Sequence, residues 1–164
     1  MNLRKIGVLG ISLGLGFTLL PGLAIAAAKP SPSPSAVAQA TADPTCVALQ
    51  EITTGDTEVR KRIENRVLGS NNWNTDFLVP GNQPFRYFVA IITPENTATY
   101  EMSVNLRLPT GASEPAFSTR ADVQAGVTFS IPFQSPTGRQ PSVVNVRVGG
   151  VNGNVYTIGV AACP

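Results

Sequence analysis

The residue types on which most enzymes rely at neutral pH are scarce in this chain. Histidine is absent, which excludes Ser-His-Asp and Cys-His nucleophilic sites and the usual zinc sites. The two cysteines, Cys46 and Cys163, are expected to pair in a disulfide, so that neither offers a free thiol. No glycine-rich phosphate loop leads into a helical pattern. The sequence therefore predicts no catalytic residue, no metal site and no cofactor.

Carboxylates are the remaining candidates for catalysis. Hydrolysis of a glycosidic bond needs two of them facing one substrate, with their pKa values pushed apart. Beyond residue 28 the acidic residues are scattered beside turns and on polar strand positions: Asp43, Glu51, Asp56, Glu58, Glu64, Asp76, Glu95, Glu101, Glu114 and Asp122. Acids in such positions stay in water and keep ordinary pKa values. We therefore expect the protein not to be an enzyme.

The single tryptophan, Trp73, stands in a run of asparagines formed by Asn71, Asn72 and Asn74. An aromatic ring can stack on the apolar face of a sugar while neighbouring amides bond to its hydroxyls, so this run is a candidate carbohydrate-binding site. The alternative is that Trp73 is a core residue, which is the usual environment of a lone tryptophan on an alternating strand. The sequence leaves both interpretations open.

The elements that would position these residues are β-strands. From Cys46 onward, one face is marked out at every second position, which is typical of half-buried antiparallel strands. The positions are Trp73, Thr75, Phe77 and Val79; Phe85, Tyr87, Val89 and Ile91; Tyr100, Met102, Val104, Leu106 and Leu108; Val127, Phe129, Ile131 and Phe133; Val144, Val146 and Val148; Tyr156, Ile158 and Val160. Turns rich in Pro, Gly and Asn separate these runs.

This pattern predicts an all-β domain over residues 45–164. The expected fold is an antiparallel two-sheet β-sandwich, immunoglobulin-like, of about seven to eight strands. A Cys46–Cys163 bridge would join the first strand to the last. Residues 57–68 fit either a strand or a short helix, because Val59, Ile63 and Val67 are four apart. We favour the strand, with a hairpin turn at 69–72 leading into the Trp73 run.

Three short segments carry a family resemblance: residues 71–77 (Asn-Asn-Trp-Asn-Thr-Asp-Phe), 85–87 (Phe-Arg-Tyr) and 93–96 (Thr-Pro-Glu-Asn). Together they resemble short exported proteins of cyanobacteria to which no function is attached. The resemblance would cover most of the domain. It implies no active site and no ligand.

The N-terminus has the order of a secretory signal peptide over residues 1–28. Arg4 and Lys5 precede an apolar run at 6–20, and small residues follow, so that cleavage is expected after Ala26 or Ala28. The apolar run is shorter than the ~20 residues that span a bilayer. Residues 29–44 are rich in Pro, Ser and Ala and are expected to be a disordered linker.

Cleavage of the signal peptide would also remove the excess of positive charge. The chain has 12 Lys and Arg against 10 Asp and Glu, and the loss of Arg4 and Lys5 equalises them. A neutral domain has no electrostatic footprint for nucleic acid or anionic lipid, and we expect no stable membrane insertion after cleavage.

Three functions follow as hypotheses. The first is an exported bacterial protein, periplasmic or extracellular, with a non-enzymatic structural or interaction role towards an envelope protein or a polysaccharide. The second is a carbohydrate-binding module that uses Trp73 and its neighbouring asparagines. The third is a small hydrolase or enzyme inhibitor. The sequence identifies no specific partner.

Overall fold

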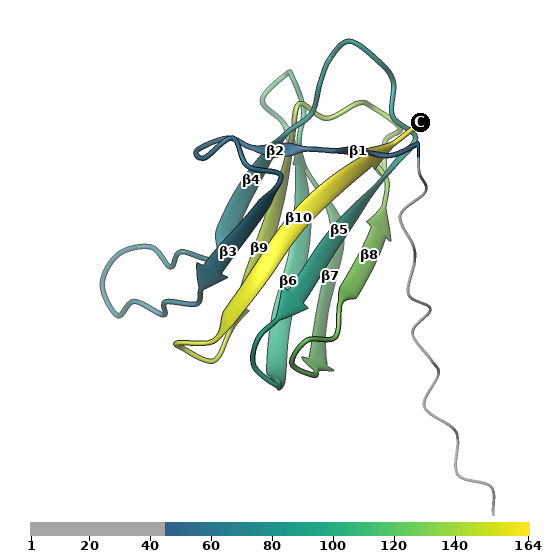
Figure 1. The fold of residues 1–164 in the computed structure, drawn as a ribbon. Helices are drawn as coiled ribbons and strands as arrows, with labels where there is room; N and C mark the ends of the chain where they lie inside the picture. Colours follow the sequence, from purple (N-terminus) through teal and green to yellow (C-terminus); the bar gives the residue numbers. More distant parts are fainter. Residues whose placement is uncertain (1–44) are drawn as a thin grey trace, which may run out of the picture. The chain divides into compact units, whose positions relative to one another are not determined.

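The computed structural model describes residues 45–164, which form ten β-strands and no helix (Figure 1). The expected signal peptide and linker, residues 1–44, lie outside the described residues. The strands are β1 (Val47–Ala48), β2 (Gln50–Glu51), β3 (Glu58–Arg62), β4 (Asn74–Leu78), β5 (Tyr87–Pro94), β6 (Ala98–Arg107), β7 (Ser113–Val123), β8 (Phe129–Phe133), β9 (Val143–Gly150) and β10 (Val155–Cys163). Within residues 45–164 there is accordingly no helix of the length and apolarity that a bilayer span requires.

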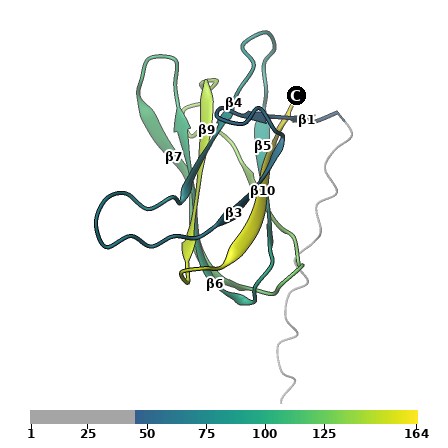
Figure 2. The same cartoon turned by 60° about the vertical axis from the view of Figure 1, so that its left-hand side comes forward.

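The strands form two antiparallel sheets of five strands each. Sheet A has the order β1-β10-β5-β8, and β3 pairs with β10 as well. Sheet B has the order β2-β4-β9-β6-β7. Figure 2 shows the two layers facing each other, with β10 and β5 on one side and β9 and β7 on the other. The predicted antiparallel β-sandwich is therefore confirmed, with more strands than expected because β1 and β2 are two-residue strands on either side of Leu49.

The core lies between the sheets and is built by the inward positions of the alternating strands. In sheet B these positions are buried throughout: Phe77 of β4, Met102, Val104 and Leu106 of β6, and Val144, Val146 and Val148 of β9. Sheet A contributes Phe88, Ala90 and Ile92 of β5, Ile131 and Phe133 of β8, and Tyr156, Ile158, Val160 and Ala162 of β10. Apolar area removed from water stabilises such a core by roughly 25 cal/mol per Å².

The face predicted for β5 is wrong. The sequence pattern placed Tyr87 and the odd-numbered residues after it on the inner face, whereas the buried core residues are Phe88, Ala90 and Ile92. The physical reason is that β5 lies inside sheet A, between β10 and β8, and is apolar on both faces. A period of two cannot identify the inner face of such a strand.

The segment after residue 57 is a strand, as favoured, but it ends at Arg62 as β3. The hairpin predicted at 69–72 is wrong, because β3 pairs with β10 in sheet A whereas β4 belongs to sheet B. The connection 63–73 therefore crosses from one sheet to the other. It leaves Val67 fully in solvent, with 98% of its surface exposed.

The predicted disulfide is present. Cys46 and Cys163 are joined with an S–S distance of 2.01 Å and a sequence separation of 117, which ties the start of the domain to the end of β10. In the chain-entropy model a loop of this order contributes about 4.7 kcal/mol to stability. Disulfides form in oxidising compartments, so the bond indicates a location outside the cytoplasm.

Candidate binding surface

The outer face of sheet B is a polar surface built on the most regular part of the fold. Because the inward positions of β4, β9 and β6 hold core residues, the alternate positions must point outward. The outward side chains are Asn74 and Asp76 of β4, Asn145 and Arg147 of β9, Glu101, Ser103, Asn105 and Arg107 of β6, and Ser118 and Arg120 of β7. We call this set of side chains the sheet B face.

Strand register sets these side chains in rows across the sheet. One row runs from Asp76 through Asn145 to Asn105, and the next places Asn74, Arg147 and Ser103 side by side. Neighbouring strands lie about 4.8 Å apart, so the members of each row are within hydrogen-bonding reach of one ligand.

Contacts within the rows hold several of these groups in place. The Nδ2 of Asn145 donates to Oδ1 of Asp76 at 2.6 Å. The second carboxylate oxygen of Asp76 lies 3.7 Å from Nη2 of Arg107, and Arg120 lies 3.5 Å from Glu101. These exposed pairs add little stability, about 0–1 kcal/mol each, but they orient donors and acceptors outward.

Trp73 lies at one end of the sheet B face, where it is half-buried rather than enclosed in the core. Its ring takes the space above Gly149 of β9: a Cβ at that glycine would lie only 2.8 Å from Cε3 of the ring. The Nε1 donates to Oδ1 of Asn65 at 2.9 Å, and the guanidinium carbon of Arg147 lies 4.3 Å from the ring centroid. The ring is thus fixed by a backbone gap, a hydrogen bond and a cation–π contact.

The predicted asparagines divide between two roles. The amide oxygen of Asn71 accepts the backbone N–H of Arg66, and that of Asn72 accepts the N–H of Glu64. Both side chains therefore hold the 63–73 connection in shape. Asn74 is exposed on the sheet B face beside Arg147. The structure brings Trp73 and Asn74 to one surface, while the amides of Asn71 and Asn72 bond to the loop backbone.

Three shallow depressions follow one another along β6 on this face. One of about 290 Å³ is bounded by Trp73, Thr99, Glu101 and Arg120. The next, about 350 Å³, shares Glu101 and Arg120 with it and is also lined by Ser103, Ser118, Thr119 and Arg147. A third of about 230 Å³ is lined by Asn74, Asn105, Arg107, Ser113 and Asn145. Together they outline an elongated polar surface.

The backbone under this surface is anchored across the sandwich by Lys61. This side chain extends from β3 of sheet A, and its Nζ donates to the backbone oxygen of Asn74 at 2.6 Å and to Oγ1 of Thr75 at 3.2 Å. Burial lowers the pKa of Lys61, while the charges of Glu51 and Asp76 oppose that shift. The lysine therefore serves as a link between the sheets at the position of Asn74.

Two carboxylates away from the sheet B face, Glu51 and Glu95, have lowered pKa values. Burial disfavours the charge of Glu51, yet the backbone N–H groups of Thr54 and Thr53, at 2.7 and 3.0 Å from Oε2, lower its pKa overall. The hydrogen bond from Arg60 lowers the pKa of Glu95. Neither acid keeps the proton that a general acid needs near neutral pH.

Glu114 follows the same rule on β7, the edge of sheet B opposite to Glu51 of β2. The hydroxyl of Thr137, at 2.7 Å, lowers the pKa of Glu114 and outweighs the opposing effect of burial. The hydroxyl of Ser135 and the guanidinium of Arg139 contribute in the same direction. Within residues 45–164, no cluster of three or more His, Cys, Asp or Glu side chains could hold a metal ion.

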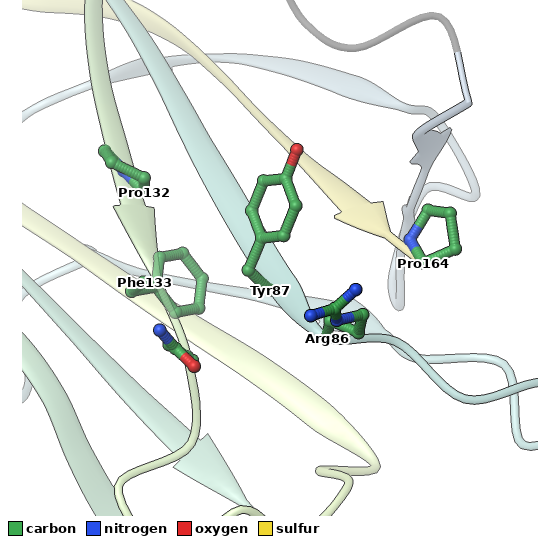
Figure 3. Close-up of a pocket in the computed structure, with 6 residues that line it drawn as sticks. Arg86, Tyr87, Pro132, Phe133 and Pro164 are labelled. Atoms are coloured by element: carbon green, nitrogen blue, oxygen red, sulfur yellow. The ribbon is translucent and has the colours of Figure 1, made fainter.

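A separate depression of about 610 Å³ lies on sheet A near the disulfide (Figure 3). Figure 3 shows Tyr87 of β5 between Pro132 and Phe133 of β8 and the C-terminal Pro164. Arg86 and Gln134 complete the lining, which contains no Asp or Glu side chain. This depression is apolar and open, and it brings together none of the residues that the sequence singled out as ligand-binding.

Sequence reasoning missed most of the sheet B face. Arg147, Asn145 and Asn105 were visible as the polar partners of alternating strands, but their meeting depends on the order β4-β9-β6. Strands that are distant in sequence become neighbours there, and no local pattern reports such pairing. The one usable signal was the alternation itself, which marked the outward positions.

Comparisons with known proteins give little further information. No protein-family model matches the chain, and no curated protein matches it. Among solved structures, a similar chain is the enzymatically active domain of tailspike protein 4 of bacteriophage CBA120, with 18% sequence identity and a TM-score of 0.35. The alignment covers 73% of this chain and 19% of that chain. We transfer neither fold nor function from it.

Proposed function

We propose that this chain is an exported, non-enzymatic β-sandwich protein that serves as an interaction module in the cell envelope or outside the cell. Its working surface is the sheet B face. The observation that carries the proposal is the elongated array of outward amides, hydroxyls and guanidinium groups along β6 and β9, set on a rigid sheet and bordered by Trp73.

The non-enzymatic part is supported by the state of the acids. The carboxylates with shifted pKa values, Glu51, Glu95 and Glu114, are all shifted downward by hydrogen bonds. Glycosidases need the reverse for one member of a pair, a carboxyl group whose pKa is raised. The export part is supported by the Cys46–Cys163 disulfide together with the signal-peptide pattern of residues 1–28.

Cell binding tests the role of the surface. The processed protein carries a fluorescent label, and its binding to intact cells is titrated beside Ser118→Glu, which adds a charge to the sheet B face on its edge strand β7, next to Ser103. Asn82→Glu, at an exposed turn position outside the face, is the matched control. We expect at least a tenfold loss for the first variant and none for the second. Equal binding by both variants and the wild type would contradict the proposal.

Turnover is tested separately. The processed protein is incubated with a panel of polysaccharides and peptidoglycan fragments, and products are followed by mass spectrometry. We expect no product. Turnover that a single Asp or Glu→Ala substitution abolishes, with the fold intact, would show that the protein is a hydrolase.

A further inference from the structure

We infer that the sheet B face binds an extended polysaccharide whose sugar units carry carboxylates, that is, a polyuronate. The inference rests on the proposed interaction role and names the chemical class of its ligand. The ligand would lie along β6, over the three depressions that follow one another from Trp73 to Arg107.

The dimensions suit a chain rather than a single small molecule. The outward residues of β6 extend from Thr99 to Arg107, and a strand rises about 3.3 Å per residue, so the surface is roughly 27 Å long. Each depression is shallow; the first two share Glu101 and Arg120, and the third continues the series at Asn105 and Arg107. A ligand that occupies them together must be long and must make many small contacts.

The polar groups match hydroxyl groups in particular. Asn74, Asn105 and Asn145 each offer a donor and an acceptor through one planar amide, and Ser103 and Ser118 do so through a hydroxyl. Sugar hydroxyls require both kinds of partner. A peptide strand would instead use backbone groups at a sheet edge, whereas these depressions lie on the face of sheet B. Trp73 and Val151 form the apolar part of the first depression, and the third is lined by polar and charged residues.

The charge of the sheet B face indicates that the ligand is acidic. Two of its guanidinium groups lie near a carboxylate, those of Arg107 and Arg120. Arg147 stacks over Trp73 instead, and no ion pair joins it to an acid within residues 45–164. A guanidinium presents a planar fork of donors that fits a carboxylate with two parallel hydrogen bonds. The central depression, which Arg147 lines, thus has one cation in excess for a uronate group.

Trp73 contributes to the proposed site in two ways, by bordering a depression and by contacting Arg147. The hydrogen bond from its Nε1 to Asn65 orients the ring, whose apolar surface borders the 290 Å³ depression. The same ring holds the guanidinium of Arg147 in place. Gly149 permits both contacts by leaving the space of a Cβ empty.

Calorimetric titration of the processed protein tests the inference. The probes are hexasaccharides of galacturonate, of mannuronate and guluronate, and of glucuronate, with a neutral β-1,4-glucan hexasaccharide as comparison. We expect at least one uronate to bind at least tenfold more tightly than the neutral glucan, with an affinity that falls as salt rises.

The variants make the residue assignment falsifiable. Arg147→Gln should lose at least tenfold in uronate affinity and lose less in glucan affinity, while Arg86→Gln, just before β5 of the opposite sheet, should bind as the wild type does. Asn105→Asp, which adds a negative charge with little change of shape, should also weaken uronate binding. Far-ultraviolet circular dichroism and thermal midpoints confirm that each variant is folded.

Two results would overturn the inference. One is that none of the uronates binds, or that glucan binds equally well; the other is that uronate affinity survives Arg147→Gln. If these occur while Ser118→Glu still reduces binding to cells, the interaction role of the face stands and only the ligand class is wrong. If Ser118→Glu has no effect on cells, the proposed function itself falls.

Discussion

Replacing Gly149 by alanine puts a methyl group where the ring of Trp73 now lies. The added Cβ would be 2.8, 2.9 and 3.0 Å from three ring carbons, closer than carbon atoms approach in folded proteins. The glycine is not needed for its backbone, since Gly149 lies inside β9 and is not among the glycines with positive φ. The substitution therefore acts through the ring.

The magnitude follows from what the displaced ring loses. The cation–π contact with Arg147 is worth about 0.5–1 kcal/mol at an exposed site, and the hydrogen bond from Nε1 to Asn65 about 0.5–1.5 kcal/mol. Replacing a strand glycine by alanine returns about 0.5–1 kcal/mol of backbone entropy. A ring that stays and strains the sheet instead costs about 1–3 kcal/mol. The net destabilisation is therefore about 0–2 kcal/mol, centred near 1 kcal/mol, which corresponds to roughly 4 °C in Tm.

The assay is urea unfolding followed by the emission of Trp73, the single tryptophan of the chain. The native emission of Gly149→Ala should also shift to the red as the ring becomes more exposed. Gly81→Ala is the matched control, because a Cβ there meets nothing within 4 Å and the backbone has no positive φ. It should be neutral or slightly stabilising.

A double-mutant cycle tests whether the cost of Gly149→Ala comes from the ring of Trp73. In a Trp73→Ala background the ring is gone, so Gly149→Ala should become neutral or stabilising, which gives a coupling above about 1 kcal/mol. If Gly149→Ala costs the same with and without the ring, the placement of Trp73 over β9 is wrong.

Three further predictions concern covalent and acid-dependent features. Replacing Cys46 and Cys163 by serine should cost about 2–5 kcal/mol, and peptide mapping without reductant should recover one linked pair. Because the folded pKa of Glu51 is lowered from 4.5, its stabilisation is complete above that value and is lost as pH falls through the folded pKa. Urea midpoints should therefore drop less in Glu51→Gln than in the wild type between pH 5 and roughly 2.5; equal drops would contradict the assignment. The intact mass of exported protein should correspond to cleavage after Ala26 or Ala28, and a membrane-bound species that retains residue 1 would exclude a signal peptide.

The sequence was sufficient for the layer architecture but not for the faces of every strand. In β6 and β9 polar residues separate the apolar ones, so one face was determined by composition alone. In β5 both faces are apolar, and the inner one depends on which strands flank it. Strand β7 was not predicted for a different reason. A register shift opposite Val104 and Asn105 interrupts the alternation of residues 113–123.

The candidate site shows a similar division. Trp73 and Asn74 were singled out from local composition, and they do lie on the sheet B face. Asn71 and Asn72 share that composition, but they satisfy backbone donors of the loop, a role decided by the path from β3 to β4. Arg147 could not be singled out, because its proposed role in binding depends on its contact with Trp73 and on its pairing with Ser103. Such neighbours are a property of strand pairing.

Photo-cross-linking on intact cells tests whether the sheet B face is the surface that contacts a partner. A benzophenone amino acid replaces Ser118 on the sheet B face in one protein and Asn82 at the exposed turn in another. Both processed proteins are irradiated on cells, and adducts are separated by size and identified by mass spectrometry. We expect abundant adducts from position 118 and few from position 82. Adducts of equal yield from both positions, or from position 82 alone, would contradict it.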